Sequence, residues 1–566
     1  MQQRLGMVED DLRAQRYLWR KQVYVLHQNL FLKKKMAKNY TTGKSYLIQT
    51  LVVLLLMNLI VYVVFRAVFV SYNKYGPIEK VLSVCLFIAE GFVLLHAFGY
   101  FIGVYRMIKS PKAELEKRQL TSFPPVAILI AARHEPKKLL ENTVISCYNL
   151  SYPAKTIYIL DDSSEQKYKD EAEDIAERYD CRLFRREIRH GAKAGVVNDC
   201  VKGLTDKYVV IFDVDQSPMR NFLNDTVAIL ESNPRLAFIQ TPQFYSNLQS
   251  NRVALASDIQ QACFYEYICE SKSANDTMMS CGTNVVIRKE ALDDVGGLDE
   301  LTVTEDFATS LNLHLKRWET LYYNHVGAFG QGPENLSAYF NQQNRWAMGA
   351  VGVLKKTLKT LLKTPSALRP IQWWEYIITS SYYWVSWAYL FLILCPIVYV
   401  FFGVPSFFMS PAVYIGSFLP YLILSNFIFI TTLKSRSYSY LKILQGQIIF
   451  FLALPVYLRG TLLGLLGINK TFTITAKGDT TMVPYIQLWP QLLLWVINLA
   501  AITWGVNKLI YSHSIALAAN LAWITCHFVL YSFVFYFNED VKKAAGDSLT
   551  VFSSGASEDL KVYQTV

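Results

Sequence analysis

Short groups of acidic residues recur in the middle of the sequence, and their spacing suggests metal and phosphate chemistry. The groups are Asp161-Asp162, Asp213-Val214-Asp215 and Thr304-Glu305-Asp306. A hard divalent cation prefers oxygen ligands, which two carboxylates on one turn can supply. Beside a nucleoside diphosphate sugar, such a cation stabilises the charge that develops on the departing diphosphate. Asp213 and Asp215 therefore predict a site for Mg²⁺ or Mn²⁺.

Asp306 is the candidate for a separate general base. Transfer of a sugar to an acceptor needs a base within hydrogen-bond reach of the attacking hydroxyl. One acidic pair alone would be weak support, because Asp also favours turns at strand ends through local hydrogen bonds. Two such pairs after successive predicted strands support a shared site more strongly.

Four apolar runs are expected to position these acids as strands of one sheet. They are short, rich in β-branched and aromatic residues, and separated by segments of helix length; they cover residues 126–130, 156–160, 208–212 and 236–240. This pattern is typical of buried parallel strands in an α/β domain. The second and third runs end directly before Asp161 and Asp213, and ligands bind at the carboxyl ends of such strands. Residues 108–345 are therefore predicted to form an α/β domain with the acids at one edge.

Long apolar segments on both sides of this domain predict a multi-pass membrane protein. A helix needs roughly 20 apolar residues to cross about 30 Å of hydrocarbon, and 52% of the 566 residues are hydrophobic. The predicted spans are 45–65, 81–105, two spans within 376–433 that are separated by a break at 403–411, 485–507 and 515–537. Glu90 and His96 lie inside the second span, where polar contact with another helix is their expected role.

The distribution of basic residues predicts the orientation of the spans. Basic residues within 33–38 are expected in the cytosol, and each pair of spans then returns the chain to that side. The apolar segment 443–458 is short and contains Pro455, and a crossing there would place the basic residues that follow it outside the cell. We therefore expect 443–458 to be interfacial or re-entrant, and 346–375 to form interfacial helices.

Composition argues against several other classes of protein. The net charge of +11 arises largely beside apolar runs, as at the cytosolic flanks of membrane spans, so no nucleic-acid partner is expected. The nine cysteines show neither Cys-x-x-Cys pairs nor zinc-ligand spacing, and are expected to be reduced thiols. The first apolar run follows about forty polar and basic residues, too late for a cleaved signal peptide.

The acidic groups, followed by Gln342-Gln343-Asn344-Arg345-Trp346, resemble in order and spacing the signature of processive family 2 glycosyltransferases. This is the family of cellulose, chitin and hyaluronan synthases. Further segments are similar to cellulose synthase catalytic subunits, namely 190–198, 240–244, 281–284 and 471–477, the last of which resembles their gating loop. The resemblance covers roughly residues 110–540. It implies a GT-A-like α/β cytosolic glycosyltransferase domain inserted in an α-helical transmembrane bundle of about six spans plus interfacial helices.

The resemblance implies a role for each matching residue. Nucleotide-sugar contacts are implied for Glu135, Asp161, Asp162, Lys193, Asp213, Asp215, Gln342 and Arg345, and metal binding for Asp213 and Asp215. Thr304, Glu305 and Asp306 are implied in catalysis, with Asp306 as the base. Trp346, Cys281 and Gly282 are implied in acceptor binding, and Phe472, Thr475 and Lys477 in a loop that closes over the nucleotide.

Some of these residues have simpler interpretations, and some positions depart from the family. Outside the motif, Trp346 would be read as a membrane anchor and Cys281 as a core residue. The first strand leads into Arg133-His134-Glu135 where cellulose synthases usually have Thr and Tyr before the Glu, so only Glu135 is carried over. About thirty residues follow the last predicted span, too few for the cyclic di-guanylate sensor of bacterial cellulose synthases, and none is expected in this chain.

The sequence thus predicts a processive, inverting hexosyltransferase that polymerises a UDP-sugar and moves the product through its own membrane channel. UDP-glucose and a β-glucan, cellulose-like or mixed-linkage, are favoured. The alternatives are a chitin- or hyaluronan-type synthase using UDP-N-acetylglucosamine, a mannan-type synthase using GDP-mannose, a lipid-carrier glycosyltransferase and a scaffold with an inactive domain. The intact Asp213, Asp215, Asp306 and Arg345 argue against the scaffold.

The expected partners are the UDP-sugar, the growing polysaccharide and membrane lipid, while accessory or export subunits stay open. The expected location is the plasma membrane, with the catalytic domain in the cytosol. The predicted divisions are a cytosolic segment at 1–44, two spans at 45–107, the glycosyltransferase domain at 108–345, interfacial helices at 346–375, two spans at 376–433, an interfacial helix and gating loop at 434–484, two spans at 485–537 and a cytosolic tail at 538–566.

Overall fold

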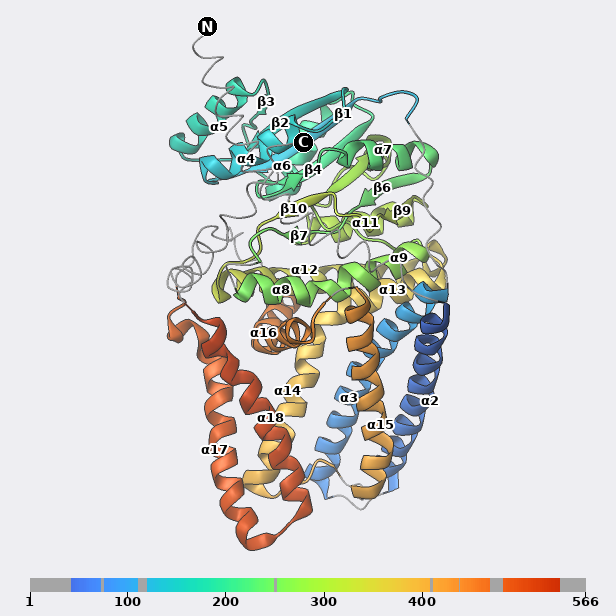
Figure 1. Cartoon of the computed structure of the whole chain (residues 1–566), viewed down its shortest axis with the longest axis vertical. Helices are drawn as coiled ribbons and strands as arrows, with labels where there is room; N and C mark the ends of the chain where they lie inside the picture. Colours follow the sequence, from blue (N-terminus) through green and yellow to red (C-terminus); the bar gives the residue numbers. More distant parts are fainter. Residues whose placement is uncertain are drawn as a thin grey trace, which may run out of the picture.

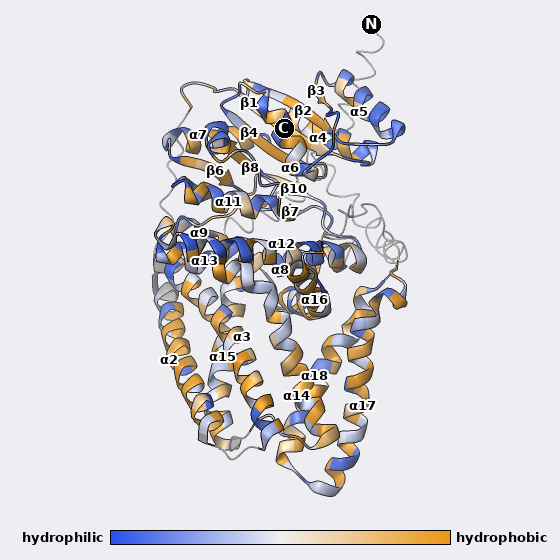
Figure 2. Cartoon of the chain, turned by 180° about the vertical axis from the view of Figure 1, so that it is seen from behind, coloured by the Kyte–Doolittle hydropathy of each residue, from blue (hydrophilic) through white to orange (hydrophobic). Residues whose placement is uncertain are grey.

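An α/β domain lies on one end of a bundle of long helices in the computed structural model (Figure 1). The structure describes residues 42–72, 76–109, 120–248, 252–407, 411–436, 438–468 and 482–539. A layer of helices that run across the bundle separates the two parts (Figure 1). Polar residues concentrate in the α/β domain and the layer, and apolar residues cover the long helices (Figure 2).

The α/β domain is built on a seven-stranded mixed sheet with the strand order β3-β2-β1-β4-β8-β6-β9. Its strands are β1 (Val126–Ala132), β2 (Lys155–Asp161), β3 (Arg182–Phe184), β4 (Tyr208–Asp213), β6 (Leu236–Gln240), β8 (Val285–Arg288) and β9 (Glu319–Tyr322). A second, three-stranded sheet pairs β10 (Ala328–Gly330) with β5 (Ser217–Pro218) and β7 (Phe244–Tyr245).

The four predicted strands exist and run in the same direction, but they are not all neighbours. β1 pairs in parallel with β2 and β4, whereas β8 lies antiparallel between β4 and β6. The four strands are parallel to one another as predicted, but the sheet as a whole is mixed because β8 was not predicted. Only four residues long, β8 is too short for its hydrophobic pattern to show which way it runs.

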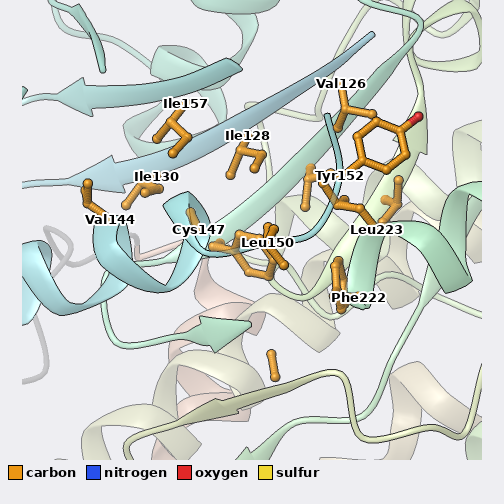
Figure 3. Close-up of a cluster of buried hydrophobic side chains, with 14 of the residues drawn as sticks. Val126, Ile128, Ile130, Val144, Cys147, Leu150, Tyr152, Ile157, Phe222 and Leu223 are labelled. Carbon is orange, nitrogen blue, oxygen red and sulfur yellow. The ribbon is translucent and has the colours of Figure 1, made fainter. Parts of the chain in front are cut away.

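Alternate side chains of β1 enter two different hydrophobic clusters, because successive residues of a strand point to opposite faces. Val126, Ile128 and Ile130 pack on one face (Figure 3) against α4 (Lys137–Tyr148), α5 (Gln166–Arg178) and α7 (Phe222–Ser232). Ala127 and Leu129 pack on the other against α6 (Ala192–Lys202), α10 (Lys289–Asp294) and α11 (Glu305–Leu315). Burial on both faces explains why the predicted strands are continuous apolar runs.

Helices between the sheet and the bundle form the middle layer (Figure 1). They are α8 (Arg252–Cys263), the π-helix η1 (Phe264–Ile268), α9 (Cys269–Ala274), α12 (Leu336–Lys363), the short 3-10 helix η2 (Pro365–Ala367) and α13 (Pro370–Ser381). The predicted domain boundary at 345/346 falls inside α12, and the boundary at 375/376 falls inside α13. The amphipathic α12 runs through both predicted divisions without a break, because it contacts the α/β domain on one side and the bundle on the other.

Seven helices of the described residues are long and apolar enough to cross a membrane. Six correspond to the predicted spans: α2 (Thr42–Tyr72), α3 (Pro77–Lys109), α14 (Val385–Phe402, reached from α13 through η3, Tyr382–Trp384), α15 (Pro411–Ser435), α17 (Trp489–Ser512, preceded by η4, Tyr485–Leu488) and α18 (Ile515–Phe537). The seventh is α16 (Tyr440–Leu466), which contains the segment that we expected to be interfacial.

The direction of α16 differs from that of the other six. It is seen almost end-on in both views, whereas the others run along the long axis of the molecule (Figures 1 and 2). It packs mainly against α8 and α12 of the middle layer. This placement accords with an interfacial helix, and the count of six spans stays our prediction.

The two ionisable residues predicted inside the second span both contact other helices. Glu90 Oε2 accepts a hydrogen bond from Arg66 Nε of α2 at 2.7 Å. His96 Nε2 lies 3.2 Å from the hydroxyl of Ser381, where α13 ends. The expectation of polar contacts between helices is confirmed.

Candidate active site

The sheet brings the first two acidic groups to the ends of two strands that lie on either side of β1. Asp161 is the last residue of β2 and is in register with Ala132 of β1, while Asp213 ends β4 and is in register with Ala131. Asp215 follows in the turn after β4, and its Oδ2 accepts a hydrogen bond from the backbone N–H of Gln331 at 3.3 Å. The acids therefore meet at the carboxyl edge of the sheet, as the sequence predicts.

Lys193 connects the end of β4 to the loop before β8. Its Nζ donates hydrogen bonds to Asp213 Oδ1 at 2.5 Å and to the carbonyl oxygen of Gly282 at 2.7 Å. Burial lowers the pKa of this ammonium group, but Asp213 and Glu305 outweigh it, and the pKa of Lys193 lies above its ordinary value. Lys193 is therefore charged, as an anion-binding residue must be.

Glu305 and Asp306 begin α11 and line a small cavity with Lys193 and Gly282. Burial, followed by repulsion from the Glu305 carboxylate, raises the pKa of Asp306 to about 7. Burial also raises the pKa of Glu305, against the attraction of Lys193. A carboxylate with a pKa near neutrality is suited to accept a proton from a hydroxyl.

The loop at Cys281 and Gly282 forms one wall of this cavity. Gly282 has φ +78°, and a Cβ at this position would lie 2.9 Å from Asp306 Oδ2. The backbone N–H of Cys281 donates to Gln240 Oε1 at 2.8 Å, which ties the loop to the end of β6. The glycine thus lets the backbone approach the candidate base closely.

The residues of the last motif lie on one stretch of α12. The side chain of Gln342 lies near the hydroxyl of Tyr245, and the charge of Arg345 acts against burial, which raises the pKa of Glu305. Trp346 is partly buried beside them. Thr304 packs against the same helix at Gly349, where a Cβ would lie 2.3 Å from Thr304 Cγ2. The start of α11 is therefore in direct contact with α12, one turn beyond the motif.

Asp161 and Asp162 are held by arginines that the sequence analysis did not single out. Asp161 is buried, and its Oδ2 accepts from Arg185 Nε at 2.8 Å. Asp162 accepts two hydrogen bonds from Arg186, both of 2.9 Å, and one from Arg189. The cluster of arginines within 185–189 is the only sequence feature that could have indicated these partners. Without the fold, nothing indicated that it would pair with acids 24 residues away.

Glu135 lies beyond the end of β1 and is partly buried, so it reaches the same edge of the sheet. Phe472, Thr475 and Lys477 of the expected gating loop lie outside the described residues.

The part of the chain that carries this site is similar to known proteins. The family described as "Glycosyl transferase family group 2" matches residues 208–432, which include Asp213, Asp306 and the motif on α12. The chain contains a family 2 glycosyltransferase domain. The predicted family and the predicted class of enzyme, a hexosyltransferase, are thereby confirmed for this domain.

Similar curated proteins include cellulose synthases. "Cellulose synthase 2" of Novacetimonas hansenii is 26% identical over 500 residues, which are 84% of this chain and 30% of that protein. The UDP-forming cellulose synthase catalytic subunit of Pseudomonas fluorescens (strain SBW25) is 25% identical over 456 residues, 77% of this chain and 59% of that one. The chain therefore spans less than two thirds of the length of these relatives.

Among solved structures, the mannosyltransferase PcManGT from Pyrobaculum calidifontis, in complex with GDP-Man and Mn²⁺, is similar in fold. The TM-score is 0.50 at 16% identity, and the match covers 69% of this chain and 100% of that chain. The GT-A-like fold expected for the domain is thereby confirmed.

Proposed function

We propose that this protein is a processive, inverting polysaccharide synthase. It transfers a hexose from a nucleotide sugar, UDP-glucose in the favoured case, to the end of a growing β-linked chain. It then passes that chain through its own transmembrane helices. The relatives named as cellulose synthases support this assignment, including the choice of a β-glucan as product.

The observation that carries the proposal is that Lys193 and Asp306 line one small cavity, and that Lys193 is bonded to Asp213. Lys193 and Asp213 supply charges suited to a nucleoside diphosphate, and Asp306 supplies a base with a pKa of about 7. Arg345, on the facing helix, adds a guanidinium group suited to phosphate. A donor site and a base thus lie together at the face of the domain nearest the membrane bundle.

The proposed reaction forms one bond and breaks one. The oxygen of the acceptor hydroxyl attacks C1 of the donor sugar from the face opposite the diphosphate, while Asp306 takes the hydroxyl proton. The bond between C1 and the phosphate oxygen breaks, and its electron pair leaves with the nucleoside diphosphate. Attack from the opposite face converts an α-linked donor into a β-linked product.

A divalent cation fits the residues at the end of β4. Asp213 and Asp215 are both carboxylates, and Mg²⁺ is commonly held by one or two protein carboxylates together with substrate phosphates. The described residues include no group of three or more His, Cys, Asp or Glu that could hold an ion by themselves, so the diphosphate would complete the coordination. When bound, the cation would offset the charge of the departing diphosphate. The complex of PcManGT with Mn²⁺ supports this choice of metal class.

Aromatic and amide groups below α12 support the proposed exit path. The hydroxyl of Tyr457 on α16 donates to Gln343 Oε1 at 3.0 Å, and the rings of Tyr383 and Tyr457 lie edge to face at 5.0 Å. Gln342 Oε1 is buried without a hydrogen-bond partner among the described residues. Such groups can stack on sugar rings and bond their hydroxyls, which a polysaccharide needs when it leaves water.

The donor and product can be tested together. Membranes that contain the protein are incubated with Mg²⁺ or Mn²⁺ and a panel of radiolabelled UDP-glucose, UDP-N-acetylglucosamine and GDP-mannose. The product is then digested with linkage-specific glucanases, chitinase and mannanase. We expect high-molecular-weight product from UDP-glucose that a β-glucanase degrades. Polymer from GDP-mannose alone would show that the donor is GDP-mannose and not UDP-glucose. If no donor gives polymer, the proposed synthase function is overturned.

A further inference from the structure

His190 joins the loop before Lys193 to the segment that leads to Asp306. The segment, residues 297–304, lies between α10 and α11. The Nδ1 atom of His190 is 2.7 Å from Glu300 Oε2 in this segment, and its Nε2 atom is 2.8 Å from Asp199 Oδ2 on α6. A neutral imidazole can donate from only one nitrogen, so bonding both carboxylates requires the doubly protonated ring.

The backbone next to His190 is fitted to Glu300. Gly191 has φ +55°, and a Cβ at this position would lie 2.2 Å from Glu300 Oε2. The glycine therefore allows the loop to lie directly on the carboxylate. Because Lys193 follows in the first turn of α6, the position of this loop sets where the ammonium group meets Asp213.

The segment 297–304 is also tied to two other elements of the site. The side chain of Asn198 bonds both the N–H and the carbonyl of Leu298, at 2.7 and 3.0 Å, and donates to Glu300 Oε1 at 2.7 Å. Asp299 forms an ion pair of 2.7 Å with Lys356 of α12. One segment therefore connects α6, α11 and α12, which carry Lys193, Asp306 and Arg345.

We propose that protonated His190 is a positioning residue for the transferase site. It holds the loop that precedes Lys193 against the segment before Asp306, and deprotonation of His190 releases one of the two carboxylates that it bonds. This inference rests on the proposed function for its effect on turnover, but the contact itself can be measured without turnover.

The charges around His190 determine how pH acts on it. Glu300 and Asp199 face its ring, and Arg186, which donates to its carbonyl oxygen, and Lys202 lie beside Asp199. The hydrogen bond with Glu300, and then the one with Asp199, raise the pKa of His190 above its ordinary value. The contact is therefore complete at low pH and is lost as the pH rises through this raised pKa. High salt weakens it because the ring is 43% exposed.

The first test compares full-length wild type with His190→Gln and His190→Arg between pH 6 and 9.5. In wild type we expect activity to fall at alkaline pH as the contact is lost. His190→Gln should lower kcat about tenfold at pH 7 and abolish this alkaline fall, while the loss of activity at acid pH stays unchanged. His190→Arg keeps a charge that can bond both carboxylates and should retain activity at alkaline pH. The control is His325→Gln, since His325 lies 4.0 Å from Asp225, outside the site. A wild-type pH profile in His190→Gln would overturn the proposal.

A second test does not depend on catalysis. Hydrogen exchange of the backbone amides of the purified protein is followed in residues 297–304 and 190–195. The rates are corrected for the intrinsic pH dependence of exchange and compared with the rates in α7. We expect protection in wild type to fall as the pH rises, and His190→Gln to show the low protection at every pH. If no donor supports polymer formation, this result still decides the contact and only the proposed function fails. Equal protection in wild type and His190→Gln would refute the role of His190.

Discussion

Asp306 combines burial with two charges of opposite sign. Burial, and then the Glu305 carboxylate, favour its protonated form, while Lys193 favours the ionised form, and the pKa of Asp306 is about 7. Its Oδ1 accepts the backbone N–H of Phe307 at 2.8 Å, and its Oδ2 faces Gly282. The carboxylate is therefore fixed in position yet able to gain and lose a proton near neutral pH.

Replacing Asp306 with Asn should abolish transfer without abolishing donor binding. The amide keeps the size of the side chain but cannot take the hydroxyl proton, so we expect kcat to fall by at least about 100-fold. Nucleoside diphosphate affinity, measured by calorimetry, should change by less than about threefold. The control is Asp170→Asn on the exposed face of α5. Wild-type turnover in Asp306→Asn would show that another group is the base.

The pH dependence of kcat/KM should report the same carboxyl group. Because a general base acts in its ionised form, activity is expected to rise with pH through about 7 and to be lost below it. Initial rates with saturating metal, measured from below about pH 4 to about pH 9, provide the measurement. An acid limb near pH 4, the range of an ordinary Asp, would contradict the assignment.

The sequence could predict which acids lie at the strand ends but not how each is paired. Asp213 and Asp215 follow a run of apolar residues whose only reasonable interpretation is a buried strand. By contrast, the partners of Asp161 and Asp162 come from the loop after β3, and the pairing depends on how β2 and β3 are placed side by side. Local sequence carries no information on that long-range packing.

At the scale of elements, the contact between α11 and α12 places the base beside the last motif. Thr304 lies at the N-terminus of α11 and packs on Gly349 of α12. The length of α12 and its packing on both sides were not predictable, because its apolar positions serve two different partners. β8 was missed for a related reason: a short apolar segment fits more than one placement.

Gly349→Val should separate these two helices. The new side chain would lie 2.3 Å from Thr304 Cγ2, so α11 must shift, and we expect polymer formation to fall at least about tenfold. Overpacking of this kind costs about 1–3 kcal/mol, measurable as a lower Tm. Gly352→Val on the same helix is the matched control, because its nearest atom would be 3.8 Å away. Equal activity of the two variants would contradict the contact.

At the scale of the whole molecule, the α/β domain is fastened to the bundle by buried ion pairs in the middle layer. Arg436, after α15, contacts Glu266 in η1 at 3.4 Å and Glu270 in α9 at 3.0 Å. Lys272 of α9 pairs with Glu375 of α13 at 2.9 Å. The spans were predictable from long apolar segments, whereas these connections join residues more than 100 positions apart.

Arg436→Ala should weaken the connection between domain and bundle. Removing one partner leaves two buried carboxylates without their cation, which costs about 3–5 kcal/mol. We expect a lower Tm for the protein in detergent. Arg235→Ala is the control, since its side chain is 65% exposed and its ion pair with Glu319 is worth under about 1 kcal/mol. A Tm unchanged in Arg436→Ala would show that other contacts hold the layers together.

The length of the product early in the reaction tests the central claim most directly. Purified protein in lipid vesicles is given excess labelled donor, and the product is sized while most donor is still unused. A processive synthase predicts long chains from the first time points, with chain number proportional to the amount of enzyme, and none from Asp306→Asn. Products that carry a single added sugar, or that all lengthen together in step, would contradict the account.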